Sequence, residues 1–339
     1  MKEFKISKKE AGQRMDKYLF KVLDRAPRSF VYKMLRKKNI VLNEKKAAGQ
    51  EILEPGDEIR IYLADDTFAK FASALPEAGK ADVPAGKGEA AASDRDRKKA
   101  FPIRVVYEDE DILVIHKPAG ILSQKAKPGD YSANEMIIDY LLETGALTEQ
   151  ELRTFRPSVC NRLDRNTSGL LIAGKTIRGL QEMAVQLRER SMKKFYRTLV
   201  SGRVKEAMHL TGYLVKDHKT NRVEVRPEGE GDFIETAYRP LEYFGSGTLL
   251  EVHLITGRSH QIRAHLASQG YPILGDEKYG DRKLNQRLYQ DTGIRGQLLN
   301  ACRMEFPDGR VIETEEPETF QQAERWLKQQ TLAKKQRKG

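Results

Sequence analysis

Three segments of the sequence carry side chains whose types and spacing could do chemistry. The first, residues 161–169, is dense in polar groups and runs into an apolar stretch, which predicts a loop that leads into a buried strand. Asp164 lies in this loop between Arg162 and Arg165. Loops on rigid scaffolds often carry functional side chains, whereas most carboxylates in Arg-rich clusters are surface ion pairs. The spacing alone leaves both interpretations of Asp164 open.

The second segment, residues 256–265, predicts a helix that begins near Ser259, with Ser259 as its N-cap, and ends at Gly270. Two chemistries suit it: anion binding by arginine and backbone N–H groups at the helix N-terminus, or acid–base work by histidine. A purely structural histidine is the simpler alternative. His260 and His265 would point about 140° apart on an ideal helix, so we do not expect them to share a metal ion.

The third segment is the aromatic stretch around residues 194–202. Strand alternation places Lys194 and Tyr196 on one face and Phe195 on the other. A tyrosine on such a face either stacks on a nucleic-acid base or packs as an ordinary core aromatic. The sequence favours neither interpretation.

The elements that must position these segments mix strands and helices without regular βαβ alternation. The predicted strands are 104–107, 111–116, 170–173, 195–200, 233–238 and 249–255, and the predicted helices are 176–190, 259–269 and 319–332. This order predicts an α+β domain over residues 102–333, built on a mixed, mainly antiparallel sheet. A basic tail, residues 334–339, follows it.

Composition narrows the class of protein. The 339 residues carry 60 Lys+Arg against 49 Asp+Glu, a formal net charge of +11, which favours a polyanionic partner such as nucleic acid. No apolar run approaches the ~18 residues that span a bilayer, and the N-terminus lacks a signal-peptide pattern. Two cysteines, Cys160 and Cys302, can form neither a disulfide framework nor a four-cysteine zinc site. We therefore expect a cytoplasmic protein without membrane association.

The positive charge is concentrated at the N-terminus. Residues 1–64 hold 16 Lys+Arg and 9 Asp+Glu, so 16 − 9 = +7 of the net +11 lies there. Predicted helices at 14–25 and 28–37 and strands at 39–42 and 58–63 make a small α+β module with a concentrated basic face. The residues expected to anchor a polyanion there are Arg28, Lys33, Arg36, Lys37 and Lys38. The Ala-, Gly- and Pro-rich composition that follows predicts a flexible linker over 65–101, which would tether this domain.

Two resemblances emerge from these motifs. Segments 14–19, 29–37, 41–43 and 55–59 make residues 1–64 similar to the ribosomal-protein-S-four-like RNA-binding domain. The order of segments 114–120, 162–171, 194–196, 256–263, 275–280 and 297–299 resembles the RluA-type pseudouridine synthase family. Two positions depart from that family's pattern, since Asn161 and Asn300 stand where histidine is usual.

The second resemblance implies an activity. That family isomerises uridine in RNA to pseudouridine, which needs no redox cofactor, nucleotide or metal, and we expect no cofactor and no metal here. Asp164 would be the catalytic carboxylate, ionised in a dry pocket with Arg263 as its cation. Tyr196 would stack on the extruded uracil, and Arg162 would fill the space that the base leaves. The further substrate-binding residues implied are Arg165, Thr167, Lys194, Arg258, His260, Gln261 and Ile262.

Several alternatives remain at this point. Large-subunit ribosomal RNA is the favoured substrate, transfer RNA is the alternative, and a monomer is the default. A non-catalytic RNA-binding or ribosome-assembly factor would also use a basic module. An RNA hydrolase would need His260 and His265 to act together, although their predicted directions are unfavourable. Asp164 could attack the sugar, attack the base or remove a sugar proton, since all three need the same ionised carboxylate.

Overall fold

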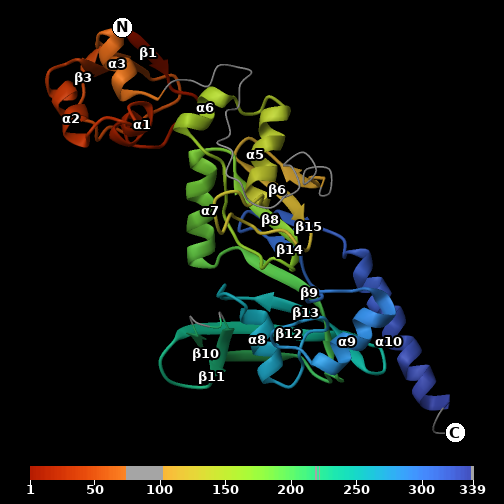
Figure 1. Cartoon of the computed structure of the whole chain (residues 1–339). Coiled ribbons are helices and arrows are strands. Elements are labelled where there is room, and N and C mark those ends of the chain that lie inside the picture. Colours follow the sequence, from red (N-terminus) through yellow and green to blue (C-terminus); the bar gives the residue numbers. More distant parts are fainter. Residues whose placement is uncertain (74–101, 218–219, 221, 337–339) are drawn as a thin grey trace.

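The computed structural model describes residues 1–73, 102–217, 220 and 222–336 (Figure 1). A small N-terminal module lies at one end of the molecule beside α6 (Glu149–Thr154), and the C-terminal helix α10 (Glu318–Gln336) lies at the other end. Between them a long sheet carries the remaining helices.

The N-terminal module is a small sheet covered by helices. Its strands, in the order β1-β4-β2-β3, are β1 (Lys2–Lys5), β4 (Glu58–Ile61), β2 (Ile40–Leu42) and β3 (Lys45–Lys46). Helix α1 (Met15–Val22) buries Met15, Leu19 and Val22, and α2 (Arg28–Arg36) buries Val31 and Leu35. Spacings of three and four residues place these side chains on one face of each helix, so both helices form where the apolar pattern predicts them.

The expected linker begins later than residue 65. Residues Asp65–Phe71 form helix α3, and Phe68, Phe71 and Ala72 pack against the apolar core of the N-terminal module. These apolar side chains have a surface to bury against, so the helix belongs to the module. The rest of the expected linker, residues 74–101, lies outside the described residues, as do residues 337–339 of the expected basic tail.

The large sheet has 11 strands and is mixed and mainly antiparallel, which confirms the predicted fold class. Its central path runs β11-β10-β12-β13-β9-β14-β8-β6-β5, with β15 on β14 and β7 on β8. Among the described residues, β8 and β14 form its one parallel pair. The strands are β5 (Val105–Glu108), β6 (Ile112–Lys117), β7 (Ser158–Val159), β8 (Ser168–Gly174), β9 (Lys193–Ser201), β10 (Met208–Asp217), β11 (Arg222–Arg226), β12 (Asp232–Tyr243), β13 (Gly247–Leu254), β14 (Leu299–Glu305) and β15 (Val311–Glu313).

A glycine allows β8 and β14 to approach closely. Gly169 has φ +108°, and a Cβ there would lie 2.2 Å from the carbonyl oxygen of Ala301. Only glycine avoids both the strain and the collision. The parallel pair therefore starts immediately after the loop that carries Asp164.

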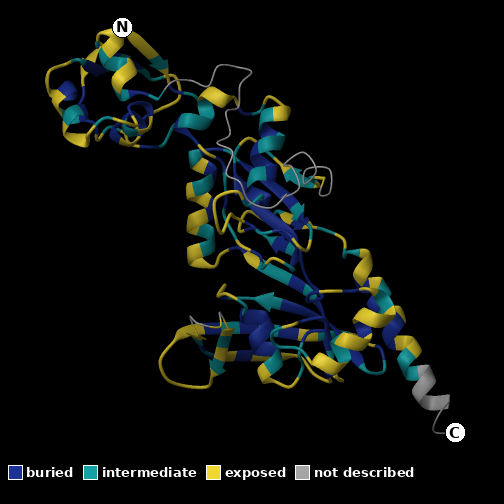
Figure 2. Cartoon of the chain, in the orientation of Figure 1, coloured by how far each residue is buried: buried dark blue, intermediate teal, exposed yellow. Residues whose placement is uncertain are grey.

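The remaining helices are α5 (Ala133–Glu143), α7 (Ile177–Glu189), α8 (Gln261–Ser268) and α9 (Arg282–Thr292). Buried residues concentrate along the central strands and in α8, whereas α7 exposes a full side to solvent (Figure 2). The largest apolar cluster joins β6, β8, β9, β13, α5 and α8, and it includes Leu163, Tyr196 and Ile262. This core therefore supports all three chemically promising segments, since each of them contributes a residue to it.

Candidate active site

Asp164 lies in the loop between β7 and β8, and its neighbours anchor that loop. The side chain of Leu163 enters the apolar core. Its backbone exchanges two hydrogen bonds of 2.9 Å with the Ser123 hydroxyl, one as donor and one as acceptor. On the other side, the Thr167 amide donates to the Asp164 carbonyl at 3.0 Å. The backbone of Asp164 is therefore fixed while its carboxylate points away from the core.

The two asparagines that depart from the expected family pattern brace the same region. Asn161 Oδ1 accepts a hydrogen bond from the Ile172 amide at 2.8 Å, and its Nδ2 donates to the Leu170 carbonyl at 3.4 Å. Asn300 Oδ1 accepts from the Ser168 hydroxyl at 2.8 Å. Each asparagine holds the start of β8 through its amide, a role that requires no titrating ring.

Arg263 projects from α8 and joins two carboxylates. Its Nη1 donates to Asp164 Oδ2 at 2.7 Å, while Nε and Nη2 donate to the two oxygens of Asp276 at 2.7 and 2.9 Å. The Asp276 side chain is 0% exposed and that of Arg263 7%, against 27% for Asp164. Asp276 fixes the guanidinium from the buried side and directs its third nitrogen at Asp164.

Burial and charge oppose each other in this cluster. Burial alone would raise the pKa of Asp276, but the hydrogen bonds and charge of Arg263, with two backbone N–H groups, lower that pKa below its usual value. Burial alone would lower the pKa of Arg263, but the hydrogen bonds and charges of Asp276 and Asp164 raise that pKa. The inner ion pair therefore stays charged. The outer carboxylate, Asp164, has an exposed fraction of 27%, so it is more accessible to solvent than the dry pocket that we expected would make it.

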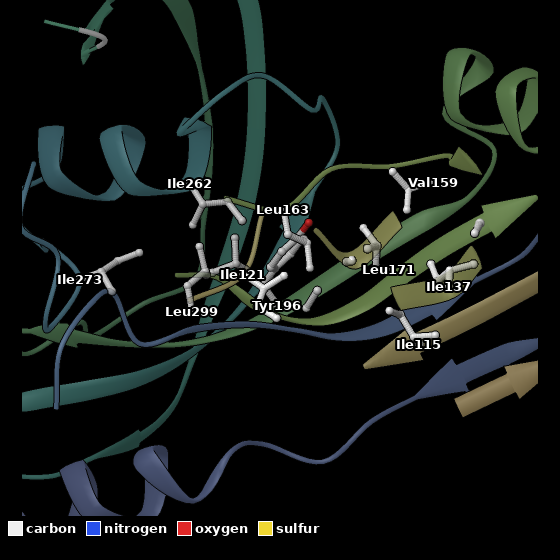
Figure 3. Close-up of a cluster of buried hydrophobic side chains, with 14 of the residues drawn as sticks. Ile115, Ile121, Ile137, Val159, Leu163, Leu171, Tyr196, Ile262, Ile273 and Leu299 are labelled. Carbon is white, nitrogen blue, oxygen red and sulfur yellow. The ribbon is translucent and has the colours of Figure 1, made fainter. Parts of the chain in front are cut away.

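Tyr196 forms part of the floor beside Asp164. It lies on β9, is 4% exposed, and packs among Leu163, Ile121 and Leu299 (Figure 3). Burial, with the nearby negative charge of Asp164, raises the pKa of its phenol, so it remains protonated at neutral pH. The side chain is a core aromatic that also lines the cavity, so its stacking on a base stays a prediction.

These side chains meet at the wall of a cavity of about 940 Å³. Its lining is rich in cations: Arg162, Arg165, Arg188, Arg190, Lys194, Arg258, Arg263 and Lys278. Asp164 and Glu277 are the acidic residues that line it within the described chain. A volume of this size admits a nucleoside, and the positive lining favours a polyanion.

His260 stands beside Asp164, at the start of α8. Its φ is +56°, its Nδ1 lies 3.0 Å from the Tyr279 hydroxyl, and its Nε2 lies 3.9 Å from Asp164 Oδ2. Burial is the main cause that lowers its pKa. His265 instead enters the core, where its Nδ1 lies 3.1 Å from the Thr236 hydroxyl. The two histidines therefore do not form a shared site, which removes the basis for a two-histidine hydrolase.

Neither a metal-binding cluster nor a membrane-spanning helix occurs among the described residues. In that part of the chain, no three histidine, cysteine or acidic side chains gather as they would around a metal ion. None of its helices has the length and apolar character needed to cross a bilayer.

Comparison with known proteins identifies the family. Residues 111–268 match the RNA pseudouridylate synthase family. The ribosomal large subunit pseudouridine synthase C of Escherichia coli is 32% identical to the chain over 324 residues, covering 92% of this chain and 91% of the relative. The chain belongs to the RNA pseudouridylate synthase family. It is an RNA pseudouridine synthase, an intramolecular transferase (isomerase).

Two further comparisons agree with this assignment. The enzyme of the same name from Vibrio cholerae is 31% identical over 307 residues, covering 89% of this chain and 87% of the relative. The solved structure of human RNA pseudouridylate synthase domain containing 4 covers 64% of this chain and 90% of its own, with a TM-score of 0.53 and 20% sequence identity. That structural likeness supports the fold.

Three expected substrate-binding residues of the enzyme do not line the cavity. Thr167 is buried, and its hydroxyl accepts a hydrogen bond from Gln297 at 3.1 Å. Ile262 packs in the apolar core. The Gln261 side chain accepts hydrogen bonds from the Thr256 hydroxyl and the Arg258 amide at 2.9 and 3.0 Å. All three support the walls of the site and do not face its interior.

The expected N-cap of α8 is also wrong. His260, not Ser259, precedes the first residue of α8, and no side-chain hydrogen bond caps this helix. The loop before the helix is held instead by Gln261, whose amide bonds replace a serine cap. This arrangement leaves Ser259 at the cavity wall.

Sequence reasoning missed two buried groups that hold the enzyme's site together. Asp276 lay in a recognised motif without an assigned role, and so did Lys117. The Lys117 ammonium is fully buried and donates to the carbonyls of Pro118, Ile121 and Arg165 at 2.9, 2.7 and 3.0 Å. Burial lowers the pKa of Lys117 to about 7. The available indication was the place of each residue within a family motif, in segments 114–120 and 275–280.

Proposed function

We propose that this enzyme converts specific uridines of large-subunit ribosomal RNA to pseudouridine, with Asp164 as the catalytic carboxylate. One observation carries the proposal: the 2.7 Å contact between Asp164 and Arg263 at the wall of a cation-lined cavity large enough for a nucleoside. The names of the Escherichia coli and Vibrio cholerae relatives support the choice of RNA.

The reaction is an isomerisation in which atoms balance. The bond between N1 of uracil and C1′ of ribose breaks, the base turns, and C5 bonds to C1′. C5 loses a proton and N1 gains one. Arg263 binds Oδ2 of Asp164, so we assign Oδ1 to the reacting nucleoside. Arg263 also supplies a positive charge beside the carboxylate when the entering base displaces water.

The target base must leave its stack to reach this carboxylate, at a cost of about a few kcal/mol. We place the extruded uracil against the ring of Tyr196, which lies beside Asp164 in the cavity. Arg162 is exposed at the same rim and would enter the space that the base leaves. In this position the protonated Tyr196 phenol would relay the C5 proton, accepting it as its own proton leaves.

Phosphate contacts would offset the cost of extrusion. At the cavity we assign them to Arg165, Lys194, Arg258 and the neutral ring of His260. In the N-terminal module, Arg28, Lys33, Arg36, Lys37 and Lys38 are all exposed on α2 and the residues after it. Beside them lies a cavity of about 600 Å³ lined by Tyr32, Arg36 and Lys46. We assign this face to RNA anchoring.

The decisive experiment maps pseudouridines in total RNA from cells that lack the protein. We expect modification to disappear at one to three uridines of large-subunit ribosomal RNA. If pseudouridine disappeared from transfer RNA alone, transfer RNA would replace ribosomal RNA as the assigned substrate. As a direct assay, the purified enzyme should release tritium from C5 of tritiated uridine in that RNA. No release from any RNA would leave a non-catalytic binding factor as the explanation.

The enzyme is proposed to act as a monomer in the cytoplasm, without a metal ion. Isomerisation transfers no electrons to an external acceptor, so the chemistry calls for no redox cofactor. Activity should therefore persist in the presence of a chelator, and full activity at high dilution would agree with a monomer.

A further inference from the structure

The N-terminal module is joined to the catalytic domain by a set of polar contacts. These contacts join residues far apart in the chain. They include Lys9 Nζ to Glu151 Oε1 at 2.8 Å, Lys21 Nζ to the Thr154 carbonyl at 2.6 Å, the Ile177 amide to the Lys9 carbonyl at 3.1 Å, Gln181 Nε2 to the Gly12 carbonyl at 3.2 Å, and Arg153 Nη2 to the Ser73 carbonyl at 2.8 Å.

Two of these contacts complete helices of the catalytic domain. The first amides and last carbonyls of a helix have no partner within that helix. Ile177 is the first residue of α7, and its amide donates to a carbonyl of the module. Thr154 is the last residue of α6, and its carbonyl accepts from Lys21 of the module. The module therefore supplies one of the hydrogen-bond partners at each of these two helix ends.

The centre of the junction is buried and paired. Glu10 is 5% exposed and Thr154 is 6% exposed, and the Thr154 hydroxyl donates to the Glu10 carboxylate. Glu10 also accepts from the amide and hydroxyl of Ser7 at 3.0 and 2.8 Å. Buried polar groups are costly unless they are paired, so this pattern selects one orientation of the module.

Helix α7 connects this junction to the catalytic cavity. Its first residue contacts the module, and Leu187, Arg188 and Arg190 at its other end line the cavity. A helix of 13 residues is about 20 Å long. In Figure 1 the helix runs from the region under the module and α6 down to the level of β9 and β13.

We propose that the N-terminal module is docked rather than tethered, so that α7 sets a fixed distance between the RNA-anchoring face of the module and Asp164. This inference rests on the proposed function, and it defines the substrate class more closely. The enzyme would select folded RNA that has two features: an RNA helix that fits the module, and the target uridine. The distance between these two features would have to match the distance between the module face and Asp164. A uridine in a short hairpin would react without that selection.

Docking makes a prediction that a flexible tether does not. For a tether, the effective concentration of the module falls roughly as the −3/2 power of linker length, so a 60-residue Gly/Ser insertion would weaken RNA binding about fivefold. For a docked module the same insertion between residues 73 and 102 leaves affinity for a large-subunit ribosomal RNA transcript unchanged. A fivefold loss in the otherwise wild-type chain would overturn the proposal.

The direct test opens the junction by charge reversal. The Lys9→Glu/Lys21→Glu variant places two carboxylates opposite Glu151 and the C-terminus of α6, and Lys5→Glu/Lys17→Glu makes the same charge change elsewhere on the module. In small-angle scattering we expect a larger radius of gyration for the first variant only, with faster exchange of the Ile177 amide. A wild-type chain that scatters as separated domains, or a first variant that stays closed, would contradict docking.

Tritium release then links docking to site selection. The opened variant should lose about tenfold or more of its rate on the ribosomal RNA transcript and keep its rate on a short uridine hairpin. Equal rates on the transcript for opened and control variants would show that the fixed distance has no role. Absence of release by every variant, with scattering unchanged from expectation, would count against the proposed function and leave docking intact.

Discussion

The candidate catalytic cavity and the proposed RNA-anchoring face of α2 are both rich in cations, but they hold them in opposite ways. Arg263 is 7% exposed and donates three hydrogen bonds to two carboxylates. On α2, Lys33, Arg36 and Lys37 are exposed and form no salt bridge within the described part of the chain. The guanidinium of Arg263 is therefore held in one position, whereas the exposed cations of α2 keep their rotamer freedom.

This difference follows from what each region has to do. A cation that positions a reacting carboxylate must be held within fractions of an ångström, which requires burial and more than one partner. Cations that neutralise phosphates act through charge and counterion release, and these tolerate mobile side chains. Substitutions in the cavity should therefore change the rate of the chemical step, and those on α2 should change binding and its salt dependence.

The largest effect is expected for Asp164→Asn. Asparagine keeps the shape of the side chain but removes the negative charge, so conversion should fall by more than about a thousandfold. Arg263 keeps its two bonds to Asp276, so the variant should fold normally and bind RNA with nearly unchanged affinity. Tritium release and filter binding would measure the two quantities. Turnover within about tenfold of wild type would remove Asp164 from its role.

The next effect is expected for Asp276→Asn, which tests whether the inner carboxylate positions the guanidinium. The substitution leaves Arg263 with a weaker partner on its buried side, and breaking a buried ion pair costs about 3–5 kcal/mol of stability. We expect a loss of about 10- to 100-fold in kcat with a smaller change in KM. Single-turnover tritium release on folded protein would measure it.

Asp281→Asn is the matched control for this experiment, because it removes one carboxylate nearby while asparagine can still cap α9. The control should keep wild-type kcat. If Asp276→Asn lowers the unfolding temperature but leaves kcat unchanged, its carboxylate is structural and does not position Arg263.

A smaller effect is expected on α2. Replacement of Lys33, Arg36 and Lys37 by glutamine should lower the slope of log K against log[salt] by about 2 and weaken binding about tenfold near physiological salt. The rate at saturating RNA should not change. Affinity measured across a salt series checks this, with Arg282→Gln/Lys283→Gln/Arg287→Gln on α9 as a variant of equal charge. Equal slopes for the two variants would place the RNA contact elsewhere.

The sequence predicted the parts of this comparison that depend on local pattern. The run of buried residues in β8, the helical spacing of α7 and the apolar face of α2 all formed where expected. The site residues Asp164, Tyr196 and Arg263 came from motif resemblance, and the structure brings them together. Spacing alone could not do this, because 99 residues separate Asp164 from Arg263.

Features decided by tertiary partners were missed. In β14, Asn300 and Arg303 interrupt the apolar pattern, so the strand carries no clear apolar run and depends on its pairing with β8 and β9. The β10–β11 hairpin was also missed, although inward and outward positions alternate along both of its strands. Asp276 is buried only because Arg263 meets it. The local sequence around a carboxylate does not indicate which cation from another segment will pair with it.

The smallest expected effect separates the two regions by pH. All six histidines lie beyond the N-terminal module, and burial is the main cause that lowers the pKa of His265 to about 4. Its unfolded value is near 6.5, so below that pH the unfolded chain binds a proton that the folded chain does not. The sign is therefore a loss of catalytic-domain stability as pH falls from 6.5 toward 4, of about 2 kcal/mol at pH 5 from His265.

Urea unfolding followed by hydrogen exchange at pH 7 and pH 5 would measure each region separately. Amides of β12 and α8 should lose protection at pH 5, whereas those of α1 and α2 should lose much less. His265→Gln keeps a hydrogen-bonding group near Thr236 and should flatten the pH dependence of the catalytic domain. An equal loss of protection in both regions, unchanged by His265→Gln, would assign the pH dependence to acidic groups, because the N-terminal module has no histidine to titrate in this range.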